Sequence, residues 1–294
     1  MEEYISEYRN YDKKAAFYFK TSDDHCGGIG DYIKFLSFLV NMGMKYGIAV
    51  YCIDFGNVTD KFLRLRHSQM HVGFEEISDN MVVFGAADKF TKEEEFHELK
   101  PGVFNVIHVA SLFNFDAGQV SGGCLFSSGI KLSDIFQFDS KVIENVPSSL
   151  KNTKYTSIHI RIGSFAHLDP YYQANGSSFN KDRLDRFLRK VNNSRKVFLC
   201  TDDLALKRKL KSEYEDLLVT DFKPVHTGDI HADERGVLNA ITDLLILANS
   251  EEIFLADDHR VSGFPVCASK FENIRLRKLI DIDDTSSNGE DTVV

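Results

Sequence analysis

Near its middle the chain contains the segment YTSIHIRIGS, Tyr155–Ser164. Its first half is rich in β-branched residues and alternates as a strand does, so we expect a strand that runs to Ile162. The following Gly-Ser pair then begins a loop. Arg161 would stand at the carboxyl end of this strand, where a guanidinium fork suits the oxygens of a phosphate or diphosphate. Taken alone, an arginine after a strand is more often a surface or salt-bridging residue.

Strands and helices alternate regularly after this segment. The sequence predicts helices at 181–191, 204–214, 234–248 and 263–271, and strands at 196–200, 217–220, 252–255 and 274–279. Parallel neighbours need crossover connections, so the alternation indicates an α/β fold with a doubly wound parallel sheet. Ligands of such sheets bind at the carboxyl ends of the strands.

The N-terminal part of the chain repeats this order. Residues 15–20 and 48–53 are expected as strands, and apolar residues at helical spacing predict a helix at 31–45 between them. A glycine-rich turn with Gly28 and Gly30 precedes the helix, where glycines allow positive φ and close backbone approach. The turn is therefore either a ligand-facing loop or a tight turn that needs small residues for packing. Further strands are expected at 81–84 and 103–110, and a charged helix at 91–99.

The length and one polar stretch indicate how the chain is divided. A chain of 294 residues fits two domains of about 150 residues. Residues 147–152, with the sequence PSSLKN, are composed like an interdomain linker. We therefore expect an N-terminal domain at 1–150, a C-terminal domain at 151–280 and a disordered acidic tail at 281–294.

Charge and cysteine usage exclude several classes of protein. The net charge of -9 argues against binding to nucleic acid or to an anionic membrane surface. The five cysteines are scattered, without a CxxC pair or metal-ligand spacing, as is typical of reduced thiols in an intracellular protein. No apolar run approaches the roughly 18 residues of a membrane span, and no charged-then-apolar leader is seen. We expect a cytoplasmic protein without a membrane span.

Polar residues gather at the carboxyl side of the second predicted sheet. Asp243 lies in a helix that is otherwise apolar on nearly every face, where a carboxylate is costly unless it is paired. It either caps or pairs with a neighbour, or accepts two N–H donors from a purine edge such as that of guanine. Ser262 opens a helix, so its hydroxyl and the free backbone amides suit a phosphate. For the serine alone, a simple N-cap is the stronger interpretation.

The order and spacing of these motifs resemble the fucosyltransferase superfamily, which contains α-1,2-, α-1,6- and protein O-fucosyltransferases. The motifs span about residues 20–271 and read GGIGD (27–31), HIRIG (159–163), TDD (201–203), DLLILANS (243–250) and SGF (262–264). The resemblance implies a GT-B fold of two facing Rossmann-like domains, with acceptor binding mainly in the first and GDP-fucose in the second. It also implies metal-independent transfer with inversion, and no cofactor besides the donor substrate.

The resemblance also implies roles for individual residues. Arg161 would bind the β-phosphate and stabilise the departing GDP, because cleavage of the sugar–phosphate bond builds negative charge on the diphosphate. His159 and Asp243 would hold the guanine and ribose end, Asp203 would lie along the donor, and Ser262 with Gly263 would contact the diphosphate. The candidate donor-binding residues are Gly28, Gly30, His159, Arg161, Asp203, Asp243, Ser262, Gly263 and Phe264.

An inverting transfer also needs a group that takes the acceptor proton, and a carboxylate is the expected kind. The candidate is Asp31, with Asp23, Asp24 and His25 as rivals, although Asp31 could equally be the N-cap of its helix. The resemblance thus implies transfer of L-fucose from GDP-fucose to a glycan hydroxyl.

One departure from the family pattern leaves alternatives open. Family members commonly carry a second arginine and an acid after the first arginine, where this chain has Ile162 and Ser164. The alternatives are the same fold with another GDP- or UDP-linked deoxyhexose or pentose, and a non-catalytic protein that binds a glycan or nucleotide.

Overall fold

The chain forms two units, Met1–Gln137 and Phe138–Val294. The computed structural model describes residues 1–19, 28–54, 58–84, 90, 92–112, 130–162, 180–191, 195–223, 225, 227, 233–256 and 262–279. The division falls before helix α7 (Ser140–Asn145) because α7 packs on α11 (Glu234–Ala248). Asn145 Nδ2 donates to Oδ1 of Asn239 at 3.3 Å and to Oγ1 of Thr242 at 3.0 Å. The linker-like residues 147–152 therefore lie inside the second unit.

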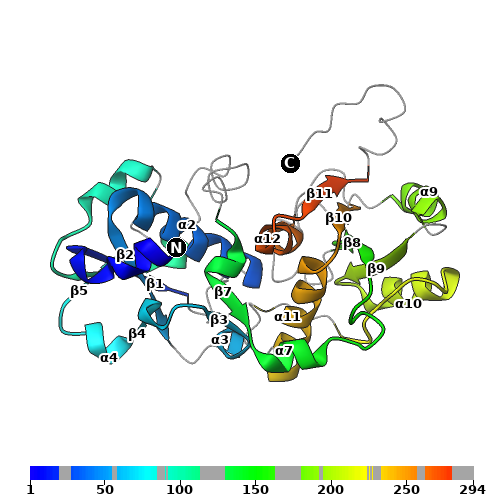
Figure 1. Cartoon of the computed structure of the whole chain (residues 1–294), viewed down its shortest axis with the longest axis horizontal. Helices are drawn as coiled ribbons and strands as arrows, with labels where there is room; N and C mark the ends of the chain where they lie inside the picture. The colour runs from blue at the N-terminus through cyan, green and yellow to red at the C-terminus, as the bar shows by residue number, and fades with distance from the viewer. Residues whose placement is uncertain are drawn as a thin grey trace. The chain divides into compact units, whose positions relative to one another are not determined.

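A five-stranded parallel sheet forms the centre of the first unit (Figure 1). Its order is β4-β2-β1-β6-β5, with β1 Lys13–Tyr18, β2 Ile48–Asp54, β4 His71–Gly73, β5 Met81–Phe84 and β6 Phe104–His108. Helix α2 (Ile29–Tyr46) joins β1 to β2 and ends at Gly47, whose φ of 63° is left-handed and favours glycine. The chain later places β6 on the other side of β1, so the strand order reverses between β1 and β6.

The two faces of this sheet are covered differently. Helix α2 covers one face, where the ring of Tyr32 lies 6.2 Å from that of Phe17. The opposite face packs Ala16, Ile53 and Val106 against Ile77 of α4 (Phe74–Ile77). The remaining described elements before the second sheet are α1 Glu2–Ser6, η1 Tyr8–Asn10, α3 Val58–Phe62, β3 Leu63–Leu65, η2 Ser68–Met70, η3 Glu93–Glu98, α5 Val109–Leu112, η4 Leu132–Asp134 and β7 Phe136–Phe138, which pairs with β3.

The second unit contains a four-stranded parallel sheet of order β11-β10-β8-β9. Its strands are β8 Tyr155–Ile160, β9 Lys196–Thr201, β10 Glu252–Leu255 and β11 Arg275–Lys278. The chain passes from β8 through α9 (Lys181–Val191) to β9, then through α10 (Leu204–Glu213) and α11 to β10 on the other side of β8 (Figure 1). Helix α12 (Gly263–Phe271) leads to β11. The strand order therefore reverses between β8 and β10.

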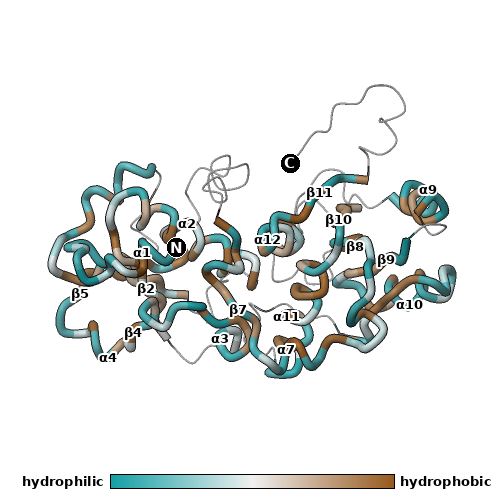
Figure 2. Tube along the Cα trace, in the orientation of Figure 1, coloured by the Kyte–Doolittle hydropathy of each residue, from teal (hydrophilic) through white to brown (hydrophobic). Residues whose placement is uncertain are grey.

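Helices cover both faces of this second sheet. Ile158 and Ile160 pack against apolar residues of α9 and α10, including Leu184 and Leu210. Tyr155 points to the other face, where its hydroxyl donates to the carbonyl of Ile246 in α11 at 2.7 Å. Figure 2 shows hydrophobic and hydrophilic segments in turn along α10, as expected for a helix with one buried side. The expected doubly wound parallel sheet is confirmed.

Some expected elements differ from the structure. Residues 217–220 form only a single parallel bridge, between Leu218 and Phe198. The charged segment expected as a helix at 91–99 is the 3₁₀ helix η3. Strand β8 ends at Ile160, so Arg161 already belongs to the following loop. The expected tail at 281–294 lies outside the described residues. No helix among the described residues is long and apolar enough to cross a membrane.

Candidate functional site

The carboxyl ends of β8 and β10 meet where the strand order of the second sheet reverses. Loops diverge to both sides at such a point, and the crevice between them is the usual ligand position in open parallel sheets. Arg161 follows β8 directly, and α12 begins at Gly263 shortly after β10. Residues 163–179 and 257–261, including Gly163 and Ser164, lie outside the described residues.

Arg161 is held in place by Asp202, which follows β9. Its NH1 atom donates to Oδ2 of Asp202 at 2.8 Å, and the two side chains are only 15% and 9% exposed. The other oxygen of Asp202 accepts the backbone N–H of Ile162 at 2.8 Å. Charge-assisted bonds of this kind are strong and directional, so the carboxylate fixes the guanidinium at the strand end. Arg161 is thus the salt-bridging residue that the sequence allowed. The ion pair holds its positive charge at the carboxyl end of β8.

His159 is a buried, neutral side chain beside Arg161. Burial, together with the smaller effect of the positive charge of Arg161, lowers the pKa of His159 to about 3. Its ring lies 6.0 Å from that of Phe264, with 33° between the planes. This contact brings the first turn of α12 next to the end of β8.

The start of α12 offers unused polar groups at the same edge. Ser262 occupies the N-cap position that the simple interpretation expects, but its side chain makes no capping hydrogen bond. Gly263 is exposed and the first turn carries no acidic residue. The amides of a helix N-terminus attract anions, and here the first turn contacts His159, two residues before Arg161. The arrangement suits a ligand with a negatively charged group.

Asp203 and Asp202 are adjacent in the sequence but bind different partners. The Oδ1 atom of Asp203 accepts the N–H of Leu206 at 2.7 Å and caps α10. Sequence reasoning chose Asp203 as the site residue and did not select Asp202. The available signal was the strand period of two, because Cys200 and Asp202 share a face with His159, whereas Asp203 falls on the opposite face.

Asp243 belongs to a buried polar cluster in the second unit. Its Oδ1 atom accepts the hydroxyl of Thr220 at 2.9 Å, and that hydroxyl accepts from Nζ of Lys207 at 3.3 Å. Burial raises the pKa of Asp243 to about 6, and Lys207 and Thr220 partly oppose the increase. Its charge, like that of Asp202, helps to raise the pKa of buried Cys200. Asp243 thus has the pairing role that the sequence left open, near the strand that carries Asp202.

The candidates of the first unit lie at the start of α2. Gly28 is the N-cap residue with φ -77° and ψ -172°, a conformation that any residue adopts. Gly30 is in the first turn, and Asp31 follows it, paired with Nζ of Lys34 at 2.9 Å. Asp31 is therefore not the N-cap that the sequence allowed. Asp23, Asp24 and His25 lie outside the described residues.

Two aromatic side chains mark the reversal point of the first sheet. Tyr18 ends β1 and His108 ends β6, and their rings pack edge to face with centroids 5.2 Å apart. Sequence reasoning did not select either residue, although their positions at strand ends gave a signal. In the part of the chain that the structure describes, no group of three or more His, Cys, Asp or Glu could hold a metal ion.

Two parallel sheets, each with a reversal of strand order at a polar edge, define a GT-B-like α/β fold. Among solved structures, NodZ α-1,6-fucosyltransferase soaked with GDP-fucose matches 96% of this chain and 99% of its own, at a TM-score of 0.54 and 13% identity. A mutant of Arabidopsis thaliana FUT1 in complex with GDP matches 94% and 72%, at a TM-score of 0.55 and 14% identity. NodZ from Bradyrhizobium matches 90% of this chain and 96% of its own, at a TM-score of 0.51 and 12% identity. The sequence matches no protein-family model and no curated protein.

At these identities the likeness establishes the fold. The resemblance to fucosyltransferases and the GT-B-like fold class expected from the motifs are confirmed at that level. Both neighbours with a ligand in their description hold GDP or GDP-fucose.

Proposed function

We propose that this protein is a glycosyltransferase that moves L-fucose from GDP-fucose to a hydroxyl of a glycan acceptor, with inversion and without a metal ion. The observation that carries the proposal is Arg161, held by Asp202 at the reversal point of the second sheet, where His159 contacts Phe264 in the first turn of α12. The fold, shared with fucosyltransferases solved with GDP or GDP-fucose, supports the choice of donor.

The diphosphate would lie between Arg161 and the first turn of α12. A guanidinium and backbone amides can meet the negative charge that grows on the leaving diphosphate, which is where transition-state stabilisation is most effective. The hydroxyl of Ser262, which is not used for capping, and the amide of Gly263 are then donors to the same group. The Asp202 carboxylate keeps the guanidinium in place before the donor binds, so no reorganisation is needed during the reaction.

The guanine end would lie against His159 and Phe264, with Asp243 nearby. A neutral imidazole can donate one hydrogen bond and accept another, and it adds no repulsion toward the N–H groups of guanine. The ring of Phe264 offers a flat apolar contact. Asp243 would accept the N1 and N2 hydrogens of guanine with the carboxylate that Thr220 already orients. Asp203 would act through its cap on α10, behind Asp202.

In the transfer, the acceptor oxygen attacks the anomeric carbon of fucose while the bond to the β-phosphate oxygen breaks. GDP leaves with the electron pair, and a base takes the acceptor proton. We assign this base to Asp31, because it is a partly exposed carboxylate in the first turn of α2. Gly28 and Gly30 would leave room for a ligand at this turn.

The direct test is release of GDP from GDP-fucose, measured by chromatography with a mixture of glycan acceptors, with and without EDTA. Wild type should release GDP and transfer fucose in both buffers. Arg161→Ala should lose about 10²–10³-fold in turnover, as expected for the loss of one transition-state donor. Arg189→Ala, which removes an exposed arginine of α9, is the matched control and should behave as wild type.

Other outcomes would redirect the proposal. Turnover with GDP-mannose or a UDP-sugar in place of GDP-fucose would keep the fold and change the donor. Full loss of activity in EDTA would contradict the metal-free mechanism. Equal turnover by wild type and Arg161→Ala would contradict the assigned site.

A further inference from the structure

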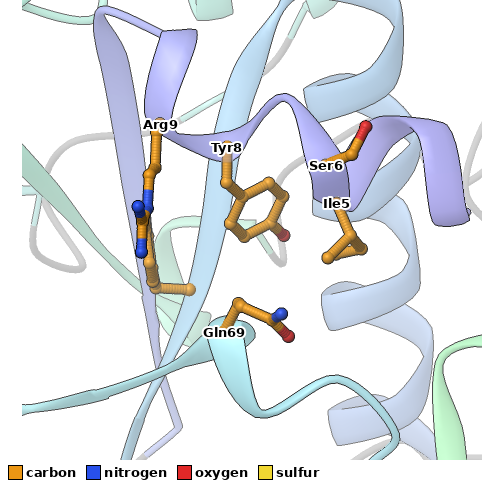
Figure 3. A pocket seen from close by; sticks show the side chains of 6 residues that line it. Ile5, Ser6, Tyr8, Arg9 and Gln69 are labelled. Atoms are coloured by element: carbon orange, nitrogen blue, oxygen red, sulfur yellow. The ribbon is translucent and has the colours of Figure 1, made fainter.

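The first unit contains a hollow that the donor site does not use. Its volume is about 390 Å³, and it is lined by Ile5, Ser6, Tyr8, Arg9, Tyr51 and Gln69 (Figure 3). The lining comes from the consecutive elements α1 and η1 and from β2 and η2, which lie much later in the sequence. Tyr51 stands on the sheet face opposite α2, so the hollow is separate from the helix start that carries Asp31.

Buried tyrosines fix one wall of this hollow. The hydroxyl of Tyr8 donates to the carbonyl of Val50 at 2.8 Å, and that of Tyr4 donates to the carbonyl of Ile48 at 2.6 Å. Tyr4 also accepts the N–H of Val50 at 3.2 Å. These bonds tie α1 and η1 to β2, so the hollow is formed before any ligand binds, which lowers the ordering cost of binding.

The polar groups around the hollow are available to a ligand. Arg9 and Gln69 are exposed, and within the described residues neither side chain has a hydrogen-bond or ion-pair partner. The half-buried Tyr51 has ring contacts, but its hydroxyl has no hydrogen bond to another described residue. Among the described residues that line the hollow, Arg9 alone is charged, and its guanidinium matches a carboxylate in a two-point contact. In Figure 3 Arg9 lies to the left of the Tyr8 ring and Gln69 lies below it.

Aromatic rings continue from the hollow across the sheet. The ring of Tyr51 lies 5.4 Å from that of Tyr8 and 5.3 Å from that of Phe104. Tyr51 and Phe104 are partly exposed, and Nζ of Lys14 lies 5.0 Å from the Phe104 centroid. Flat, rigid rings with polar neighbours suit a sugar, which has an apolar C–H face and hydroxyls at its rim.

We propose that this hollow is a second carbohydrate-binding site, which takes an acidic sugar residue of a glycan. The sugar carboxylate pairs with Arg9, the hydroxyls contact Gln69 and Tyr51, and the C–H face rests on the half-buried ring of Tyr51. A uronic acid and a sialic acid share this chemistry. Binding at this site requires no nucleotide, so it can be tested independently of the proposed donor site.

The test is calorimetric titration of the whole chain with three probes at low salt. The probes are 3′-sialyllactose, a hyaluronan tetrasaccharide that carries glucuronate, and neutral lactose. At least one acidic probe should bind, and lactose should bind at least about tenfold more weakly, because it cannot make the charge-assisted contact. The acidic probe that binds identifies the source of the carboxylate.

Substitutions of the lining residues test whether the acidic sugar binds in the hollow. Arg9→Gln should weaken the acidic probe about tenfold, and Gln69→Ala should weaken it by a smaller factor. Arg189→Gln removes the same charge from the exposed side of α9 and should bind the probe as wild type does. All three variants should bind GDP equally. The proposal is overturned if neither acidic probe binds, if lactose binds as well as they do, or if Arg9→Gln binds as wild type.

Discussion

Arg161 and Asp202 lie 2.8 Å apart at the ends of two neighbouring parallel strands, and both side chains are largely buried. Asp202 also accepts the N–H of Ile162, the residue after Arg161, so one carboxylate holds both the guanidinium and its backbone. The side chain of Ile162 itself packs against the hydrophobic core of the second unit. The relationship makes Asp202 a positioning residue for Arg161.

Asp202→Asn should therefore slow turnover without abolishing the fold. Asparagine can still accept the N–H of Ile162, but the charge that orients Arg161 is lost. We expect kcat to fall about 10- to 100-fold, as for a misplaced catalytic group, while KM for the donor changes little. Steady-state kinetics with GDP-fucose measure both. A variant with unchanged kcat, or with a change in KM alone, would show that Asp202 does not act through Arg161.

Asp243→Ala should destabilise the second unit through its buried neighbours. It removes the acceptor of Thr220 and leaves the charge of Lys207, which is 2% exposed, without its carboxylate neighbour. The free energy of unfolding should fall by about 1–3 kcal/mol. Lys207→Met in the same chain should restore part of the loss. Urea unfolding of wild type, the two single variants and the double variant gives a double-mutant cycle. If the changes in unfolding free energy simply add, Asp243 and Lys207 are not coupled.

His159 should make stability depend on pH below its ordinary pKa. Its pKa is about 3 in the folded protein, so between about pH 3 and 6.5 the unfolded chain binds a proton that the native state does not. Wild type should gain about 1.4 kcal/mol of stability per pH unit from this histidine as pH rises from 4 to 6. Asp243, with its raised pKa near 6, acts with opposite sign over this range.

Comparison with His159→Gln isolates the histidine, because Asp243 is present in both proteins. The stability difference between wild type and variant should grow in favour of wild type as pH rises from 4 to 6, and stay level above about pH 7. Urea unfolding at several pH values gives the two curves. Parallel curves would mean that His159 is not held neutral.

Gly43→Ala should loosen the attachment of α1 to the first sheet. A Cβ atom at Gly43 would lie 2.6 Å from the carbonyl oxygen of Ile48 and 2.8 Å from Cγ2 of Val50, and it would overlap the hydroxyl of Tyr4. Overpacking of this kind lowers stability by about 1–3 kcal/mol. Tyr4→Phe should recover part of the loss in the double variant, since the overlapping oxygen is gone. Thermal unfolding measures the four proteins, and an unaffected Gly43→Ala protein would contradict the packing.

Helix α11 follows from the sequence because its 15 residues form a long and largely apolar segment. Strand β8 follows because its residues are rich in β-branched side chains. The strands β3, β4 and β7 have three residues each, too few for any period to appear. Residues 217–220 looked like a strand, but only Leu218 pairs with β9, through a single bridge. Local propensity could not show this, because it does not report how many backbone partners a short segment finds in the fold.

The site was predictable where it depends on strand ends. Arg161 follows from the break after β8, and Asp202 could have been chosen over Asp203 by strand alternation. The partners of Asp243 could not be predicted from the sequence. Lys207 of α10 is linked to Asp243 of α11 through the hydroxyl of Thr220, and this link exists only in the folded chain. The hollow around Arg9 and Gln69 likewise forms only when η1 and η2 meet on the sheet.

The most direct test of the central claim is thermal unfolding of wild type and Arg161→Ala with GDP, UDP or GDP-fucose. A ligand that binds only the folded state raises stability by RT ln(1 + [L]/Kd), so the melting temperature reports binding without knowledge of the acceptor. The account predicts an increase with GDP and GDP-fucose, a smaller one or none with UDP, and a reduced increase in Arg161→Ala. Equal increases with GDP and UDP, or none with any nucleotide, would contradict it.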